Sequence, residues 1–245
     1  MAAPLLEVEG LGKRFGGFVA LDAIALSVSP GERVGLIGPN GSGKSTLVNC
    51  ICGTLVNETG TVRFDGTKMN GLTAHERTRA GLARSFQLPR PFTSMTVAEN
   101  LRVPLFYTVN ARPGTRLSAA EIDERSVELL ALVGLAGKAA QHPRDLTQVE
   151  MRKLELARAL AAEPKLLIAD ESMAGLSNAE VADIVALLIR LNKRGITIIM
   201  IEHIMRAVMS FSQRLVVLVS GKKIADGAPE AVIRDPDVER AYIGQ

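Results

Sequence analysis

The stretch "ERVGLIGPNGSGKS", residues 32–45, decides the fold, because a short apolar run leads directly into a glycine-rich loop. Its second half, residues 38–45, matches the pattern G-x-x-x-x-G-K-[ST]. In this pattern, the backbone N–H groups of the loop and the positive end of the following helix hold a phosphate group. A plain glycine turn is the alternative interpretation. The expected strand before the loop and helix after it favour a phosphate-binding loop.

The residue types in this loop suit the phosphates and the metal of a nucleotide. Gly41 and Gly43 let the backbone wrap a phosphate at dihedral angles or distances that a Cβ would forbid. Lys44 would reach the β- and γ-phosphates, and Ser45 would place its hydroxyl on Mg²⁺. The candidate binding residues are Gly38, Pro39, Asn40, Gly41, Ser42, Gly43, Lys44, Ser45 and Thr46.

Two acidic residues end a second apolar run, "LLIADE", residues 166–171. A continuous apolar run of this kind is typical of a strand buried on both faces. In an open α/β sheet the ligand lies beyond the carboxyl ends of the strands, so both acids should face the bound phosphates. Asp170 would hold Mg²⁺ through water, and Glu171 would align or deprotonate an attacking water. Acids that cap the next turn are the alternative, which the phosphate loop disfavours.

The composition is that of a globular protein with a mixed-charge surface. Of 245 residues, 47% are apolar and 22% are charged, so the chain can bury a substantial core. The formal net charge of +3 gives no reason to expect a nucleic-acid partner. No apolar run approaches the roughly 18–20 residues that span a bilayer, and no signal peptide is evident. Cys50 and Cys52 are too close in sequence to form a disulfide with each other and should pack as small apolar groups.

The order of the predicted elements indicates an α/β core that contains a helical insertion. The first 30 residues mix short β-type runs with glycine turns and predict an antiparallel sheet. The middle of the chain lacks a strongly β-like run, and beyond it strands alternate with helices, which predicts a mostly parallel sheet. We expect a single domain, 1–245, in which 1–88 and 163–245 form the core and 89–162 forms a helical subdomain.

Two local patterns are clear enough to predict individual elements. The segment 118–134 places Ile122, Leu129, Leu130 and Val133 on one helical face and ends at Gly134. The segment 214–227 predicts a hairpin that turns at Ser220–Gly221 and is followed by short helices.

The motifs "GPNGSGKST", "LLIADESMAGL" and "IEH", in this order, resemble those of the ATP-binding subunit of an ABC transporter. The resemblance covers nearly the whole chain and implies a P-loop NTPase of the ABC type with ATP and Mg²⁺ as cofactors. It implies that Phe15 stacks on adenine, although simple packing is an alternative. It also implies that residues 174–177 touch an opposite subunit. The catalytic residues that it implies are Glu171, His203 and Gln87, and the metal-binding residues are Ser45, Gln87 and Asp170.

Other segments resemble one branch of this family. "KRFGGFVALD" (13–22), "ARSFQLPRPFTSMTVAENL" (83–101) and the C-terminal segment from residue 221 are similar to the ATP-binding proteins of branched-chain amino acid importers. The longer of the two ATPases of such systems is the better match. Relatives that power lipopolysaccharide export, or uptake of urea and amides, share much of this pattern. A soluble ABC ATPase without a transport role is a third interpretation, but such proteins usually carry a second ATPase domain or a long insertion.

The segment "LTQVEMRK", residues 146–153, falls where the family has its Leu-Ser-Gly-Gly-Gln signature. Thr147 keeps the hydroxyl and Glu150 takes the glutamine position, so a capping box and a helix start are predicted here. Gln148 and Val149 replace both glycines, and a Cβ at each should hinder close approach to a phosphate. We therefore expect a weakened signature and a heterodimer with unequal sites.

The resemblance also implies the partners. A second ABC ATPase subunit, identical or different, would close with this chain on two MgATP. Two membrane permeases would dock near Gln87 and Phe92, although ordinary packing explains Phe92 equally well. A periplasmic solute-binding protein would act indirectly through the permeases. We expect the chain to be cytoplasmic and peripheral on the inner face of the membrane.

Overall fold

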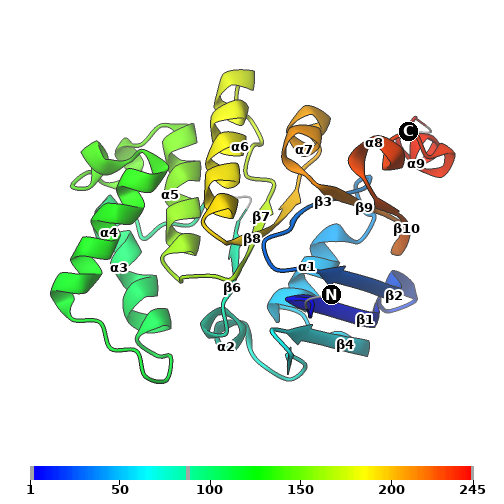
Figure 1. Ribbon diagram of the computed structural model, residues 1–245, viewed down its shortest axis with the longest axis horizontal. Coiled ribbons are helices and arrows are strands. Elements are labelled where there is room, and N and C mark those ends of the chain that lie inside the picture. The colour runs from blue at the N-terminus through cyan, green and yellow to red at the C-terminus, as the bar shows by residue number, and fades with distance from the viewer. Residues whose placement is uncertain (1–2, 87–88, 244–245) are drawn as a thin grey trace.

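Two β-sheets organise the computed structural model, which describes residues 3–86 and 89–243 (Figure 1). The smaller sheet is antiparallel and has the order β2-β1-β4-β5. Its strands are β1 (Leu6–Phe15), β2 (Phe18–Val28), β4 (Thr59–Phe64) and β5 (Thr67–Lys68). The predicted N-terminal antiparallel sheet is therefore confirmed.

The larger sheet has the order β10-β9-β3-β8-β7-β6. All of its neighbouring strands are parallel except β10 and β9, which form the predicted hairpin. Ser220 and Gly221 turn that hairpin with φ values of 47° and 76°, as a two-residue turn of type I′ requires. The strands are β3 (Arg33–Ile37), β6 (Leu82–Ser85), β7 (Leu166–Asp170), β8 (Thr197–Ile201), β9 (Arg214–Val219) and β10 (Lys222–Gly227).

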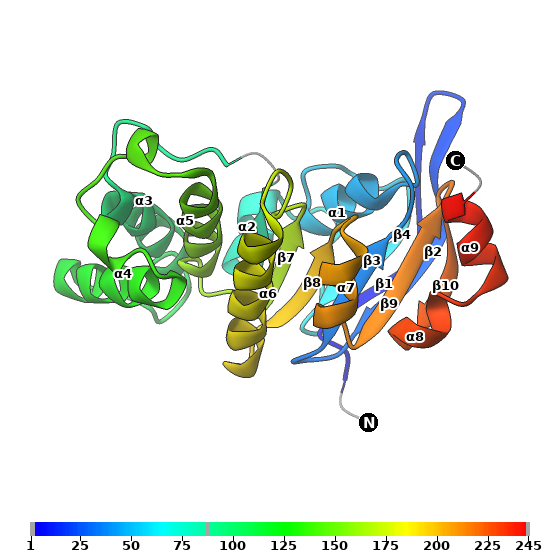
Figure 2. The same ribbon diagram turned by 90° about the horizontal axis from the view of Figure 1, so that it is seen from above.

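The central strands are buried on both faces, as their continuous apolar sequences predict. Every residue of β7 and of β8 is buried, and alternate side chains enter different apolar clusters. Leu166 and Ile168 face the cluster that contains α1 (Lys44–Cys52) and the small sheet. Leu167 and Ala169 face α6 (Asn178–Lys193) and α7 (Met205–Phe211). Figure 1 shows α1 below the large sheet and these two helices above it, and Figure 2 shows the two helices in front of the strands.

A group of helices lies beyond the edge strand β6 (Figure 1). It consists of α3 (Val97–Pro104), the π-helical turn η1 (Leu105–Val109), α4 (Ala119–Val133), the short turns η2 (Ala136–Lys138) and η3 (Pro143–Asp145), and α5 (Gln148–Leu160). As predicted, α4 ends at Gly134 and buries Ile122, Leu130 and Val133, whereas Leu129 is half-buried. The remaining helices are α2 (Ala74–Arg79), α8 (Pro229–Val232) and α9 (Pro236–Ile243).

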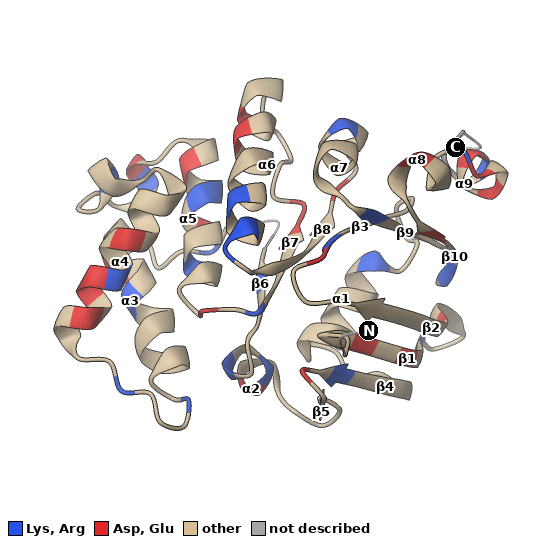
Figure 3. Ribbon diagram, viewed as in Figure 1, with Lys and Arg blue, Asp and Glu red and all other residues tan. Residues whose placement is uncertain are grey.

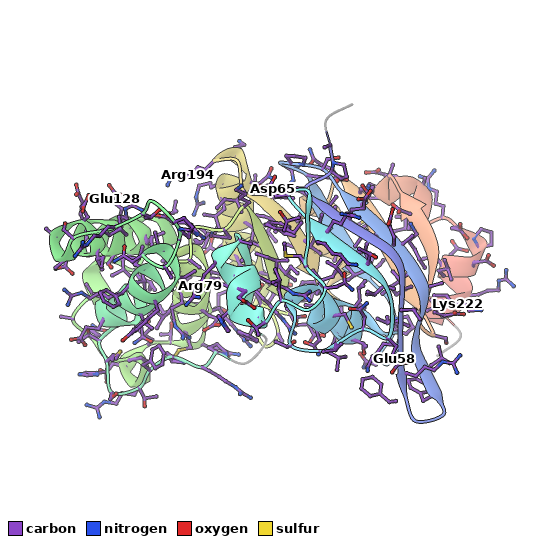
Figure 4. All side chains as sticks on the ribbon, turned by 90° about the horizontal axis from the view of Figure 1, so that it is seen from below. Glu58, Asp65, Arg79, Glu128, Arg194 and Lys222 are labelled. Carbon is purple, nitrogen blue, oxygen red and sulfur yellow. The ribbon has the colours of Figure 1, made fainter. Side chains whose placement is uncertain are left out.

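Arg112, just after η1, joins these helices to the core. Its Nε donates to the carbonyl of Arg79 at 2.8 Å, and its guanidinium also bonds to the carbonyl of Ala162. Figure 4 shows Arg79 between Glu128 on the helices and Asp65 beside the small sheet. Arg112 thus ties the chain after η1 to the end of α2 and to the chain just after α5.

The surface carries charges of both signs along the outer helices and strands (Figure 3). None of the described helices is both long enough and apolar enough to cross a bilayer.

Candidate active site

The predicted phosphate loop connects β3 to α1. Gly41 and Gly43 have φ values of 77° and 102°, in the left-handed region that favours glycine. Gly43 is the N-cap of α1, so the unpaired N–H groups of the first turn lie at the loop. The amide of Gly221 donates to the carbonyl of Ser42 at 3.0 Å, which ties the loop to the β9–β10 hairpin.

Lys44 lies across this loop. Its Nζ donates to the carbonyls of Gly38 at 2.7 Å and Pro39 at 3.0 Å. Burial lowers the pKa of Lys44, whereas the nearby carboxylates of Glu171 and Asp170 raise it. The ammonium therefore sits between loop carbonyls and acidic groups, where it can contact an anion that enters the loop.

Both predicted acids lie at the end of β7, beside the loop. Asp170 is the last residue of the strand, and Glu171 follows it with φ 44°. The amide of Glu171 donates to the carbonyl of Ile201 in β8 at 2.9 Å, which fixes this unfavourable backbone angle. Non-glycine residues held at such angles cluster at functional sites. Both acids and the predicted Ser45 and Thr46 line one cavity of about 740 Å³.

The donor set of this cavity fits Mg²⁺ in the company of phosphates. No cluster of three or more His, Cys, Asp or Glu side chains that could hold a metal occurs among the described residues. Mg²⁺ typically takes one or two carboxylates and completes its shell with water and substrate phosphates. Asp170 and the hydroxyl of Ser45, facing the same cavity, suit that arrangement. A cation held here would neutralise phosphate charge.

Phe15 lies at the end of β1 and forms another part of the cavity wall. Its ring is half exposed, and the Nζ of Lys13 lies 5.5 Å from the ring centroid. An exposed aromatic face of this kind is available for contact with a planar group.

Several residues of the cavity wall were not predicted. They are Asn49, Thr54, Leu55, Arg84, Phe86, Arg90, Glu155 and Arg158. Arg84 is the most notable, because its Nε donates to Oδ2 of Asp170 at 3.1 Å and a second guanidinium N–H bonds to the same oxygen. No local pattern identifies Arg84, since it lies in a four-residue strand, β6, that the sequence did not predict.

Two predicted catalytic residues are not brought to the cavity by the described structure. Gln87 lies outside the described residues. His203, just beyond β8, is exposed and is not among the described residues that line the cavity. Its Nδ1 is 4.0 Å from Oε2 of Glu202.

Glu202 is a buried acid that the sequence analysis missed. The amide of Met173 donates to its Oε1 at 2.9 Å. Burial raises the pKa of Glu202 to about 7, because desolvation outweighs this hydrogen bond and the charges of Glu171 and Asp170 act in the same direction as burial. Glu202 thus links the chain after β8 to the chain after β7.

The predicted capping box at the start of α5 is confirmed. The amide of Thr147 donates to Oε2 of Glu150 at 2.8 Å, and the amide of Glu150 donates to Oγ1 of Thr147 at 3.4 Å. The hydrogen bond from the Thr147 amide, and a smaller contribution from the Thr147 side chain, lower the pKa of Glu150, and Lys138, 3.5 Å from Glu150, acts in the same direction.

The two residues in place of the signature glycines point in different directions. Val149 is half-buried against the apolar core of the helical group. Gln148 is exposed, and its Nε2 donates to the carbonyl of Ala174 at 3.3 Å. A Cβ on Gly175 would lie 2.6 Å from the same Nε2. Gln148 therefore contacts the loop 174–177 of its own chain.

A second cavity, of about 310 Å³, adjoins the first. Phe86, Phe92 and Tyr107 are exposed aromatic residues on its wall. Asn100 is completely buried and holds the backbone of Phe92, accepting from its amide at 2.8 Å and donating to its carbonyl at 3.1 Å. The buried Asn100 side chain thus fixes the backbone position of Phe92.

Comparison with known proteins places this architecture. The family model described as ABC transporter matches residues 21–174. The high-affinity branched-chain amino acid transport ATP-binding protein BraF of Pseudomonas aeruginosa is 38% identical over 254 aligned residues, covering 100% of both chains. LivG of Escherichia coli K12, which carries the same description, is also 38% identical, with 100% coverage of both chains.

The fold matches a solved structure over its whole length. An ATP-binding cassette of an ABC transporter in its ADP conformation superposes with a TM-score of 0.89 and 32% identity, covering 100% of both chains.

Proposed function

Since the chain belongs to the ABC transporter family, we propose that it is the ATP-hydrolysing subunit of an importer for branched-chain amino acids or related amides. The full-length identity to ATP-binding proteins of branched-chain amino acid transport supports this choice of solute most strongly. The alternative of lipopolysaccharide export has no comparable observation in its favour.

The lining of the cavity suggests a role in ATP binding or hydrolysis for each of its predicted residues. The loop amides and Lys44 would bind the triphosphate, and Phe15 would stack on the base. Asp170 and Ser45 would hold Mg²⁺, with Gln87 as a further contact. Glu171, held at the cavity wall by its backbone bond to β8, would orient a water for attack and accept its proton. His203 would reach the γ-phosphate only after a rearrangement, because it is not among the described residues that line the cavity.

The second cavity is a groove that suits contact with a membrane subunit. Phe86, Phe92 and Tyr107 offer apolar contact area next to the nucleotide cavity. We propose that one of the two permeases inserts a short helix here, so that the chain sits on the inner face of the membrane. A second ATPase subunit would complete the pair, and a periplasmic binding protein would deliver the solute to the permeases.

Reconstitution tests this function. The chain would be co-expressed with two permeases and a second ATPase subunit of the same source, and the purified complex placed in liposomes with the binding protein. We expect ATP-dependent uptake of labelled leucine or isoleucine. Extraction of lipopolysaccharide without amino acid uptake would contradict the proposal.

We further propose that the signature segment gives unequal sites in a heterodimer. Gln148 is exposed at the start of α5 and bonded to its own loop. Because it stands at a signature position, its side chain would hinder the approach of a partner's phosphate. Glu150 adds a carboxylate beside it, partly compensated by Lys138. Val149 contributes less, because its side chain packs inward.

This proposal predicts the effect of restoring one glycine. In a variant that binds MgATP but cannot hydrolyse it, Gln148→Gly should strengthen ATP-dependent homodimerisation at least about tenfold, measured by light scattering during size-exclusion chromatography. Gln148→Ala is the matched control, because it keeps the Cβ. An unmodified chain that forms an ATP-dependent homodimer hydrolysing at two equivalent sites would disprove the unequal sites.

A further inference from the structure

Asp170 forms an ion pair with Arg84. The Arg84 guanidinium donates to Oδ2 of Asp170 through two N–H groups, one of them Nε at 3.1 Å. Its remaining terminal nitrogen donates to Oδ1 of Asn49 at 2.6 Å. The side chains of Arg84 and Asp170 are only 14% and 7% exposed. The guanidinium is therefore held in one orientation at the base of the nucleotide cavity.

The charge of Asp170 explains why such a partner is needed. A carboxylate that is almost completely removed from water is costly unless a positive group or hydrogen-bond donors compensate it. Lys44 compensates Asp170 only through space, because its Nζ donates its hydrogen bonds to the loop carbonyls of Gly38 and Pro39. A metal ion would need the same carboxylate that Arg84 now engages. Arg84 engages only Oδ2 of Asp170, but a divalent cation beside the guanidinium would repel it, so Arg84 and Mg²⁺ compete for one acid.

Arg84 also stands between the two cavities. Its guanidinium carbon lies 5.2 Å from the ring centroid of Phe86, which is 46% exposed. Five residues line both the nucleotide cavity and the adjoining groove: Thr54, Arg84, Phe86, Glu155 and Arg158. A guanidinium that left Asp170 would also leave its present position against Phe86, and so would alter the wall of the groove.

We propose that Arg84 is the resident counter-ion of Asp170, that it is displaced when Mg²⁺ enters with ATP, and that this displacement is felt at Phe86 in the groove. Arg84 is in this sense a positioning residue, since it acts through Asp170 and Phe86 and not on ATP itself. The inference rests on the proposed binding of MgATP in this cavity.

The first test compares nucleotide affinity with and without the metal. The full chain would be titrated with a fluorescent ATP analogue in EDTA and, separately, in Mg²⁺. In Arg84→Met, Asp170 would face the phosphates uncompensated, so metal-free affinity should fall about tenfold or more. Affinity in Mg²⁺ should hold or improve, because no guanidinium must leave. The dissociation constant in EDTA divided by that in Mg²⁺ should therefore rise at least about tenfold.

Two further variants isolate the Arg84–Asp170 pair. Arg90→Met removes a positive charge from the wall of the same cavity, where Arg90 is exposed, and should shift both affinities together. In an Asp170→Asn background, Arg84→Met should no longer weaken metal-free binding. Arg84→Lys keeps the charge and replaces Arg84→Met if that variant does not fold; it should raise the ratio by a smaller factor, because it loses the paired N–H donors.

The second test follows the groove directly. The chain contains no tryptophan, so Phe86→Trp introduces a single indole over the Arg84 guanidinium. Its emission should change with MgATP but much less with ATP in EDTA. Adding Arg84→Met should remove the difference between the two conditions.

Each result bears on a separate claim. An unchanged affinity ratio in Arg84→Met, or equal Phe86→Trp emission with MgATP and with metal-free ATP, would overturn the role of Arg84. Failure of the unmodified chain to bind the ATP analogue at all would instead contradict the proposed function.

Discussion

Replacing Glu171 by glutamine is expected to lower the rate of ATP hydrolysis by about 10³-fold while MgATP still binds. General base catalysis by a positioned carboxylate contributes about 10²–10⁴-fold, and an amide cannot accept the proton of the attacking water. Size and shape are nearly unchanged by the substitution. The affinity for MgATP should therefore stay within a few-fold, because the loop amides and Lys44 are untouched.

The backbone at Glu171 makes this expectation specific. Its positive φ and the 2.9 Å bond from its amide to Ile201 fix the direction in which the side chain leaves the strand end. Glutamine keeps both features, so a loss of turnover would report on the carboxylate and not on misfolding. Phosphate release under saturating ATP measures the rate, and binding of a fluorescent ATP analogue measures the affinity.

Glu128→Gln is the matched control. Glu128 is exposed on α4, in the helical group and away from the cavity (Figure 4). The Glu128→Gln variant loses the same charge as Glu171→Gln and should hydrolyse ATP at the rate of the unmodified chain. Retained hydrolysis in Glu171→Gln would remove Glu171 from the role of base.

The glycine loop and the acidic pair could be predicted from the sequence, because each requires particular secondary structure beside it. The glycine loop required a strand before it and a helix after it, and β3 and α1 occupy those places. The acids had to follow a strand buried on both faces, and β7 is completely buried. Because parallel strands end at one edge of a sheet, Ser45 and Thr46 at the end of the loop line a single cavity together with both acids.

Contacts set by strand pairing could not be read in this way. β6 has four residues and includes an arginine, so it lacks the apolar run that identifies the central strands. Only its register against β7, which pairs Arg84 with Ile168, brings the guanidinium within reach of Asp170. The direction of a side chain at a helix start is equally hidden. Gln148 and Val149 were both expected to hinder a phosphate, yet Gln148 faces a loop and Val149 faces the core.

Replacing Lys44 by alanine is expected to weaken MgATP binding by about 100-fold or more. Each charge-assisted hydrogen bond from an ammonium to a phosphate oxygen contributes roughly 1.5–3 kcal/mol, and each 1.4 kcal/mol corresponds to about tenfold in affinity. Two such bonds, to the β- and γ-phosphates, give the expected loss. The substitution removes the bonds from Nζ to the carbonyls of Gly38 and Pro39, but the bond from Gly221 to Ser42 and the start of α1 at Gly43 do not involve the lysine side chain and should hold the loop.

The affinity change must be separated from a general loss of positive charge. Lys165→Ala is the control, because Lys165 is an exposed lysine that pairs with Asp65 on the surface. Surface pairs of this kind contribute about 0–1 kcal/mol to stability, and this one does not line the cavity. Isothermal titration with MgATP should give the unmodified affinity for Lys165→Ala and little or no heat for Lys44→Ala. If Lys44→Ala kept the unmodified affinity, the triphosphate would not be bound by this loop, and the roles assigned to Asp170, Glu171 and Arg84 would lose their basis.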